Sequence, residues 1–310
     1  MRHFLSLEDV SLEDVWLTIG SFDGVHKGHQ AILNHLIAGA SAKGVPAVVL
    51  TFHPHPAVVL RNRQGPYYLT LPDERANLMG KLGVDVVITH PFSQEIAQYS
   101  ADTFINLLVS HLKISHLLVG HDFALGRNRQ GDANYLTKLG VVYNFSVELF
   151  HPVRNQDEII SSSNIRAALR AGEITKVNSM LGRAYSLTGR VEHGDARGRS
   201  IGIPTANLSI SPDLLTPGAG VYACKVVVND RTYQAVTNIG FRPTFYDQEK
   251  RVHVEAHILD FQEDIYQKEL VVYFVERLRG EKRFENAETL VSQIHKDIEN
   301  TRIWFKEIKS

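Results

Sequence analysis

The stretch "TIGSFDGVHKGHQ", residues 18–30, decides the fold of the first part of this 310-residue chain. It begins inside the apolar run "VWLTIG" (15–20) and leads into a segment, 29–42, whose apolar residues recur at helical spacing. A strand, a glycine-bearing turn and a helix in this order are typical of an α/β sheet. His26 and His29 lie three residues apart in this turn, so we ask which chemistry the turn carries.

The turn has three possible interpretations. The first N–H groups of a helix point outward without partners, and the helix dipole adds positive charge, so a phosphate can bind there. Gly24 and Gly28 allow a sharp turn and a close approach to a ligand, and the imidazoles of His26 and His29 can donate hydrogen bonds. A metal site is less favoured, because neither cysteine nor a firmly placed third ligand accompanies the two histidines. Spacing alone does not choose between the phosphate site and a glycine turn with two surface histidines.

The rest of the first half continues the strand and helix pattern. Short apolar runs alternate with helical stretches, and they are mostly apolar at successive positions. This pattern predicts a parallel sheet covered on both faces, with ligands at the strand ends. Besides 15–20, the predicted strands are "AVVLTF" (47–52), "VDVVIT" (84–89), "SHLLVG" (115–120) and "FSVELF" (145–150).

From about residue 185 the pattern changes to closely spaced strands without helices between them. "VVVNDRTYQAV" predicts a hairpin that turns at Asn229-Asp230, and the set of strands predicts a small antiparallel barrel. A last helix is expected near 286–305, and segment 161–183 predicts two short helices broken at Gly172. We therefore predict two domains, residues 1–183 and 184–310.

Composition limits the classes of protein to which the chain can belong. Lys plus Arg (33) nearly cancel Asp plus Glu (34), so no basic excess indicates a nucleic-acid partner. The single cysteine, Cys224, excludes an intramolecular disulfide and a cysteine-based metal cluster. No apolar run approaches the roughly 20 residues of a membrane span, and the N-terminal segment carries acids in place of an apolar signal core. We expect a cytoplasmic protein with no membrane or nucleic-acid partner, and the oligomeric state stays open.

Several motifs resemble those of a known family. "GSFDGVHKGH" resembles the HxGH signature of the nucleotidyltransferase superfamily, and in order along the chain further segments resemble the bacterial bifunctional riboflavin kinase/FMN adenylyltransferase family, also called FAD synthetases. The resemblance covers nearly the whole chain, and HxGH followed by PTAN is far more specific than HxGH alone. The matching segments are "TFHPHP" (51–56), "LGVDVVI" (82–88), "VGHDFALGRNRQGD" (119–132), "SSSNIR" (161–166), "GRVEHGDARGRSIGIPTANL" (189–208), "GVYA" (220–223), "TNIGFRPTF" (237–245) and "VEAHILDF" (254–261).

The resemblance implies a fold and two reactions. The fold is an α/β nucleotidyltransferase domain, Rossmann-like with HxGH, followed by a small antiparallel β-barrel riboflavin kinase domain with a C-terminal helix. The barrel would phosphorylate riboflavin to FMN with ATP, and the α/β domain would transfer AMP from ATP to FMN, giving FAD and pyrophosphate. Riboflavin, FMN, FAD and ATP are the implied ligands, and both steps should need Mg²⁺.

In the first domain the resemblance places His26 and His29 on the phosphates of ATP. Without it, Asp122 and Phe123 would be interpreted as a helix cap and a packed phenyl ring, and Arg127 and Arg129 as equally well a solvated loop. Guanidinium groups match the geometry of phosphate, which supports Arg127 and Arg129 as phosphate ligands. The remaining implied contacts to nucleotide or flavin are Gly20, Phe22, Asp23, Gly24, Phe52, His55, Asp122, Phe123, Arg127, Arg129, Ser162 and Arg166.

In the second domain the resemblance assigns Thr205 and Asn207 of "GIPTAN" to the Mg·ATP site, and their hard oxygens suit Mg²⁺. It assigns Gly194, Gly198 and Gly202 to a loop over the phosphates. It makes Glu255 the base that orients or deprotonates the ribityl 5′-hydroxyl of riboflavin. From pattern alone Glu255 is a solvated strand residue, because the apolar positions 252, 254, 256 and 258 alternate with it.

Three other functions fit parts of the sequence. An enzyme with one idle module would lack some motif residues of that module, and none is missing. A flavin-binding sensor or carrier would need neither Glu255 nor the two histidines of HxGH. A cytidylyltransferase that acts on a small phospho-alcohol would share the turn at 18–30 but would not explain the PTAN segment.

Overall fold

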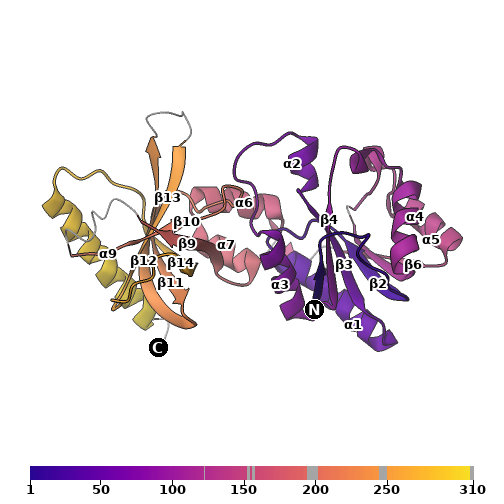
Figure 1. Cartoon of the computed structure of the whole chain (residues 1–310), viewed down its shortest axis with the longest axis horizontal. Helices are drawn as coiled ribbons and strands as arrows, with labels where there is room; N and C mark the ends of the chain where they lie inside the picture. Colours follow the sequence, from indigo (N-terminus) through magenta and orange to yellow (C-terminus); the bar gives the residue numbers. More distant parts are fainter. Residues whose placement is uncertain (122, 152–153, 156–157, 194–201, 244–249, 308–310) are drawn as a thin grey trace. The chain divides into compact units, whose positions relative to one another are not determined.

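The computed structural model describes residues 1–121, 123–151, 154–155, 158–193, 202–243 and 250–307 (Figure 1). The chain forms two compact units, Met1–Ser162 and Ser163–Ser310. The division falls after the first residue of α6 (Ser162–Ala171) and before α7 (Ile174–Leu181). The sequence predicts these two helices around a break at Gly172. The domain boundary between 183 and 184 stays a prediction.

The first unit contains a parallel six-stranded sheet with the order β1-β4-β3-β2-β5-β6. All five strands that the sequence predicts are present. The additional edge strand β1 has only three residues, too few for a periodic pattern, and pairs with β4. The strands are β1 (Arg2–Phe4), β2 (Val15–Ile19), β3 (Ala47–His53), β4 (Val86–Pro91), β5 (Ile114–Gly120) and β6 (Ser146–Phe150).

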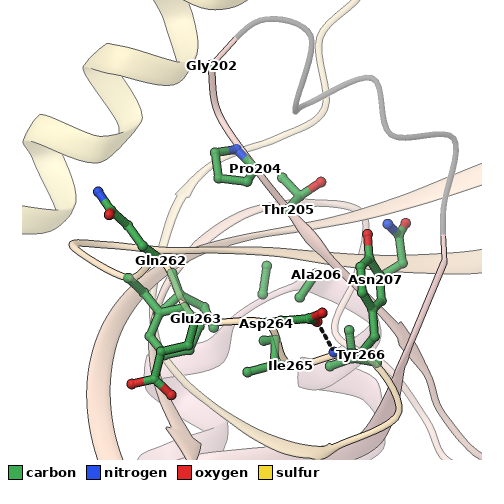
Figure 2. A pocket seen from close by; sticks show the side chains of 14 residues that line it. Gly202, Pro204, Thr205, Ala206, Asn207, Gln262, Glu263, Asp264, Ile265 and Tyr266 are labelled. Atoms are coloured by element: carbon green, nitrogen blue, oxygen red, sulfur yellow. Dashed lines mark hydrogen bonds between the residues drawn. The ribbon is translucent and has the colours of Figure 1, made fainter.

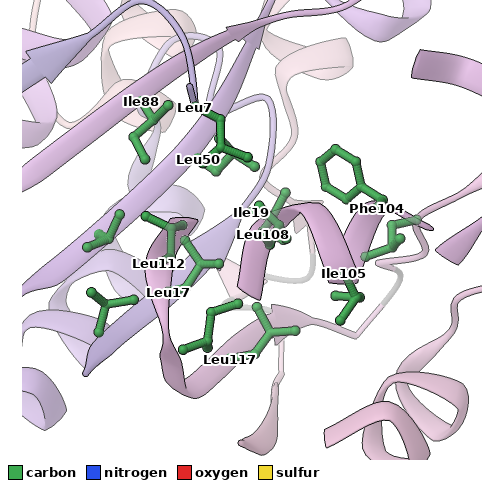
Figure 3. Packing of buried hydrophobic residues seen from close by; sticks show 14 of the residues in the cluster. Leu7, Leu17, Ile19, Leu50, Ile88, Phe104, Ile105, Leu108, Leu112 and Leu117 are labelled. Carbon is green, nitrogen blue, oxygen red and sulfur yellow. The ribbon is translucent and has the colours of Figure 1, made fainter. Parts of the chain in front are cut away.

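Helices cover both faces of this sheet, as the sequence predicts. Helices α1 and α3 contribute to one apolar cluster, and α4 and α5 contribute to a second, separate cluster. Figure 3 shows the second cluster, where Ile105 and Leu108 of α4 lie over strand residues such as Leu17. The helices are α1 (Lys27–Lys43), α2 (Pro56–Leu60), α3 (Pro72–Leu82), α4 (Ala101–Leu112) and α5 (Ala133–Tyr143), with short 3₁₀ turns at Ile96–Gln98 and Arg127–Arg129.

Trp16 fixes the packing of α1 on the sheet. Its indole stacks on the His116 ring, with 4.0 Å between ring centroids. On α1, a Cβ added to Gly39 would lie 1.8 Å from the Trp16 ring, so only glycine fits at this position. Burial lowers the pKa of His116, because desolvation of the charged imidazolium outweighs the contribution of its hydrogen-bond partner Glu148.

The second unit is a closed antiparallel barrel, followed by a helix. The barrel order is β10-β13-β12-β11-β14-β9, and pairing of β9 with β10 closes it. Asn229 and Asp230 form the hairpin turn between β11 and β12 with φ of 50° and 58°, as a two-residue turn with left-handed central residues requires. The elements are β9 (Tyr185–Glu192), β10 (Ala206–Ser209), β11 (Gly220–Val228), β12 (Arg231–Pro243), β13 (Lys250–Ile258), β14 (Glu269–Arg279) and α9 (Ala287–Glu307). Short strands β7 (Arg154–Asn155) and β8 (Glu158–Ile159) form a separate hairpin.

The barrel carries an ion pair to its C-terminal helix and a buried cysteine. The Arg279 guanidinium donates to both carboxylate oxygens of Asp297 over 2.8–3.1 Å, and Asp297 is only 2% exposed, so this pair fixes α9 on the barrel. Cys224 lies inside, fully buried, and burial raises the pKa of its thiol to about 12. A buried thiol with that pKa is almost entirely protonated near neutral pH and is therefore chemically inert.

Membrane insertion finds no support in the helices. Within the described ranges, none combines the length and the apolar composition that crossing a bilayer requires.

Helix α7 should be needed for full stability of the second unit. Asn178 donates to the carbonyl of Phe274 and accepts from the N–H of Tyr185, and α7 buries Ile174, Val177, Met180 and Leu181. At about 1.5 kcal/mol or more for each buried apolar side chain, fragment 184–310 should lose on the order of 5 kcal/mol relative to fragment 163–310. Urea unfolding followed by the emission of Trp304, the only tryptophan in either fragment, measures the difference. Equal unfolding free energies would contradict this role of α7.

Candidate active sites

The turn after β2 lies at the carboxyl edge of the parallel sheet, where ligands usually bind in such folds. Phe22, Gly24 and Val25 all have positive φ, at 46°, 82° and 40°. Left-handed backbone at Phe22 and Val25 is strained for residues with a large or branched side chain. Strain of this kind persists only where surrounding structure fixes it, and it is concentrated at functional sites.

The structure brings His26 and His29 together at the start of α1. His26 is the N-cap residue, and its Nδ1 accepts a hydrogen bond from the His29 backbone N–H over 3.2 Å. This bond places the proton of a neutral His26 ring on Nε2, where it can be donated elsewhere. The two rings stack with centroids 3.6 Å apart. A Cβ added to Gly28 would lie 3.2 Å from the His26 ring, so the glycine leaves room for this arrangement.

Asp23 points into the protein from the same turn. Its carboxylate accepts hydrogen bonds from the backbone N–H groups of Leu69 and Thr70 over 3.0–3.1 Å and from the Thr70 hydroxyl over 3.2 Å. Asp23 is fully buried. Its backbone carbonyl accepts from the hydroxyl of Ser162, which brings a second predicted site residue to the turn. Asp23 therefore attaches the turn to the backbone at Leu69 and Thr70.

Polar side chains that the sequence did not predict surround Asp23. Arg75 on α3 is fully buried and lies 3.6 Å from the Asp23 carboxylate. The Thr70 hydroxyl accepts from the N–H of Gly24 over 3.0 Å. A signal for Arg75 does exist, because it falls four residues before Met79, on the buried face of α3.

Phe52 and His55, which are predicted to border the flavin, also make contacts that stabilise the fold. Phe52 is 9% exposed and packs against Phe92 and Phe104 at centroid distances of 5.5 and 6.1 Å. His55 caps α2, with its Nδ1 accepting from the Ala57 N–H over 2.9 Å, and its own N–H donates to the Tyr68 hydroxyl. Phe52 lies near the end of β3, and His55 follows two residues after that strand. Both are therefore at the same sheet edge as the turn.

The remaining predicted residues of the first site lie on other elements of the chain. Phe123 is half-buried against the apolar cluster of α4 and α5, whereas Asp122 lies outside the described residues. Arg127 and Arg129 are exposed in a 3₁₀ turn after β5. Arg166 is 4% exposed on α6, in the second unit.

The barrel contains a pocket of about 370 Å³ at the PTAN segment. Three of the predicted site residues, Gly202, Thr205 and Asn207, line it, and Gly194 and Gly198 lie outside the described residues. The loop after β13, residues 261–266, forms a facing wall that the sequence did not predict. Figure 2 shows this loop opposite Thr205 and Asn207. Its Tyr266 ring stacks on His193 with 3.8 Å between centroids. The pocket residues are Val191, Gly202, Pro204, Thr205, Ala206, Asn207, Ala256, Ile258, Phe261, Gln262, Glu263, Asp264, Ile265 and Tyr266.

Strand register places Glu255 next to Asn207, which lines this pocket, although Glu255 itself is not a lining residue. Glu255 of β13 pairs directly with Asn207 of β10 on one side and with Asn238 of β12 on the other. Directly paired residues in antiparallel strands project to the same face. The alternation predicted for β13 is observed, because Glu255 is half-buried whereas its neighbours Val254 and Ala256 are buried. Asn238 belongs to this polar row and was not predicted.

A magnesium ion would fit this pocket through its oxygen ligands. In the described ranges no group of three His, Cys, Asp or Glu side chains is arranged to hold a metal ion. The Thr205 hydroxyl and the Asn207 amide oxygen both line the pocket. Two neutral oxygens suit Mg²⁺ that keeps waters and binds the phosphates of a nucleotide, which is the way this ion is usually held.

Two family models match the chain in sequence order. The FAD synthetase model matches residues 9–164, and the riboflavin kinase model matches residues 181–305. This chain belongs to the bifunctional riboflavin kinase/FMN adenylyltransferase family.

Individual relatives agree with this assignment. The bifunctional riboflavin kinase/FMN adenylyltransferase of Listeria monocytogenes is 37% identical and aligns over 94% of this chain and 93% of its own length. That of Pseudomonas fluorescens is 39% identical over 92% of this chain and 91% of its own. A crystal structure described as a macrolide-efflux protein from Streptococcus pneumoniae is 30% identical, with a TM-score of 0.87, and covers 97% of this chain and 98% of the other. The whole order of an α/β unit and a barrel is thus found in a solved structure.

Replacing Asp23 should destabilise the first unit of the enzyme. Asp23→Ala leaves two buried N–H groups without their acceptor and the Arg75 charge without its carboxylate, so we expect a loss of about 3–5 kcal/mol. Urea unfolding followed by Trp16 emission in a W304F background reports on the first unit alone, because the chain has only these two tryptophans.

Asp9→Ala is the matched control. Asp9 is exposed in the same unit, so its removal should change the unfolding free energy by less than about 0.5 kcal/mol. Equal effects of the two substitutions would contradict the structural role of Asp23.

Proposed function

We propose that the two reactions of this family take place at two separate groups of side chains in this enzyme, one in each unit. Membership in the family makes the chain a riboflavin kinase and an FMN adenylyltransferase with ATP as co-substrate. The kinase reaction converts riboflavin to FMN and releases ADP. The adenylyltransferase reaction joins FMN to AMP from ATP, giving FAD and pyrophosphate. The observation that supports the separation best is that the turn with His26 and His29 lies in one compact unit, whereas Thr205, Asn207 and Glu255 lie in the other.

The adenylyltransferase site is assigned to the turn after β2 and the start of α1. A phosphate oxygen of FMN attacks the α-phosphorus of ATP, the bond to the bridging oxygen breaks, and pyrophosphate leaves. Negative charge then grows on the departing pyrophosphate. The ring N–H groups of His26 and His29, with the backbone at the start of α1, would stabilise this charge. The step needs no covalent intermediate on the protein, because positioning and charge stabilisation suffice.

The other residues predicted for the adenylyltransferase site would complete it. Gly20, Phe22, Asp23 and Gly24 shape the turn, and Ser162 holds it through the Asp23 carbonyl. Phe52, His55 and Phe123 would border the flavin, together with Asp122. Guanidinium groups of Arg127, Arg129 and Arg166 would bind phosphate.

The kinase site is assigned to the pocket at the PTAN segment. Glu255 would orient the ribityl 5′-hydroxyl of riboflavin and take its proton as the hydroxyl oxygen attacks the γ-phosphorus of ATP. Thr205 and Asn207 would hold Mg²⁺, which neutralises charge on the nucleotide phosphates when bound. The register that puts Asn207 directly beside Glu255 supports this arrangement, because it keeps the metal ligand and the base on adjacent strands. Gly194, Gly198 and Gly202 would belong to the covering loop.

The Mg²⁺ requirement and the location of this enzyme stay predictions. A requirement for Mg²⁺ in both steps is proposed from the chemistry of phosphoryl and adenylyl transfer. Action in the cytoplasm without a nucleic-acid partner is expected from composition and charge.

His29→Ala should impair FMN adenylylation and spare riboflavin phosphorylation. A charge-stabilising contact made mainly in the transition state contributes about 3 kcal/mol, so we expect a loss of around a hundredfold in kcat/KM. Both reactions are measured on one preparation, with pyrophosphate-coupled and ADP-coupled assays. His35→Ala, farther along the same helix, is the control and should keep both rates within about twofold. An equal loss of both activities in His29→Ala would contradict the assignment.

Glu255→Gln should have the opposite effect. Glutamine keeps the size of the side chain but cannot take a proton, and general-base catalysis typically contributes about a hundredfold to ten-thousandfold. Because the phosphoryl transition state is loose and needs little early deprotonation, we expect about a hundredfold or somewhat less.

Glu269→Gln, at an exposed position on β14, is the matched control. FMN adenylylation should be nearly unchanged in both variants. If Glu255→Gln phosphorylates riboflavin at the wild-type rate with saturating Mg·ATP, Glu255 is only a solvated strand residue.

A further inference from the structure

Arg75 of α3 is the largest fully buried side chain in the described part of the chain, and its guanidinium joins three separate segments of the first unit. Both terminal nitrogens are used. Nη1 donates to the Ser21 carbonyl over 3.0 Å, the Thr51 hydroxyl over 3.3 Å and the Phe52 carbonyl over 3.5 Å; Nη2 donates to the Thr70 carbonyl over 2.9 Å and lies 3.6 Å from the Asp23 carboxylate.

The segments that Arg75 joins all border the predicted adenylyltransferase site. Ser21 begins the turn that leads to His26, and Phe52 lies near the end of β3 and is predicted to border the flavin. Thr70 lies just before α3 and binds the Gly24 N–H through its hydroxyl. A hydrogen bond from Thr51 to the Ser21 carbonyl, 2.9 Å long, links the first two segments a second time. Arg75 thus determines the separation between the turn and the end of β3.

Stability alone does not explain an ion pair at this place. Burial of a guanidinium and a carboxylate requires both to give up water, and a well-packed apolar pair of similar volume is often as stable or more so. What an apolar pair cannot do is hold two backbone carbonyls and a hydroxyl at fixed directions, as the planar fork of arginine can. Lysine would keep the charge but not the fork.

We propose that Arg75 is a positioning residue for FMN adenylylation. This inference rests on the proposed function of the turn after β2. The guanidinium holds the phosphate-binding turn and the end of β3 at the separation that aligns an FMN phosphate oxygen with the α-phosphorus of ATP. Arg75 does not touch either substrate, and it acts through Ser21 and Phe52.

The test compares Arg75→Lys with core variants of the first unit on α4, a helix to which Arg75 donates no hydrogen bond. Ile105→Val and Leu108→Ala on α4 provide this series, because both residues are fully buried in the other apolar cluster. The stability of each variant is measured by urea unfolding with Trp16 emission in the W304F background. FMN adenylylation and riboflavin phosphorylation are then measured at a temperature at which every variant is folded.

A misplacement of about 1 Å can reduce a reaction rate about a hundredfold. We therefore expect Arg75→Lys to lower kcat for FMN adenylylation at least tenfold, with the KM values for ATP and FMN within about threefold. The core variants should keep their kcat within about twofold, and riboflavin phosphorylation should be unchanged in all of them. If Arg75→Lys keeps the kcat of core variants of the same stability, or changes only KM, the proposal is wrong.

Two further variants separate the possible failures. If the first unit of Arg75→Lys does not fold, the neutral double variant D23N/R75M takes its place, because it removes both charges together. Recovery of stability without recovery of kcat supports positioning, and recovery of both refutes it.

His29→Ala is assayed beside these variants. If His29→Ala keeps full adenylylation, the proposed site itself is wrong. If His29→Ala is inactive and Arg75→Lys is fully active, only the role of Arg75 is refuted.

Discussion

The buried carboxylate of Asp23 is the constraint on which the first unit depends. A buried carboxylate must find donors, and it finds them in the backbone of Leu69 and Thr70 and in the guanidinium of Arg75. These partners lie more than forty residues along the chain. The turn after β2 can therefore keep the strained backbone at Phe22 and Val25, since its position is fixed through Asp23 as well as by β2 and α1.

Strand register has the corresponding role in the barrel. Each strand carries apolar residues inward, so the partner of every outward residue is fixed once the barrel is packed. The row that contains Asn207, Glu255 and Asn238 follows from this register and not from any local motif. A slip by one residue would turn Glu255 into the interior and expose Val254. The same hydrophobic pattern that folds the barrel thus determines where its polar side chains meet.

Local features of the sequence predicted most of the fold. Strand patterns predicted β2 to β6, β9 and β11 to β14, but not β7, β8 or β10. The Asn229-Asp230 pair predicted a hairpin, and the glycine turn before 29–42 predicted the start of α1. The alternation along β13 placed Glu255 on the outer face. These signals work because the periods of strands and helices can be recognised from residues that are close together in the sequence.

Features that depend on distant partners were not predictable in this way. Asp23 looks like a ligand-binding carboxylate in sequence, but only the fold brings Leu69 and Thr70 to it. Arg75 lies in an ordinary helical pattern, and its burial depends on carbonyls from two other segments. The pocket wall at 261–266 is a loop without periodicity, so only closure of the barrel places it opposite Thr205.

The two sheets also differ in how they end. The barrel closes on itself through β9 and β10, so every strand has two partners. The parallel sheet has two open sides, one of them the three-residue β1 and the other the longer β6, where Leu149 is 39% exposed. Unpaired backbone groups along such a side can recruit a strand from another chain. Aggregation of a partly unfolded molecule is therefore expected to start from β6, and the barrel offers no equivalent starting point.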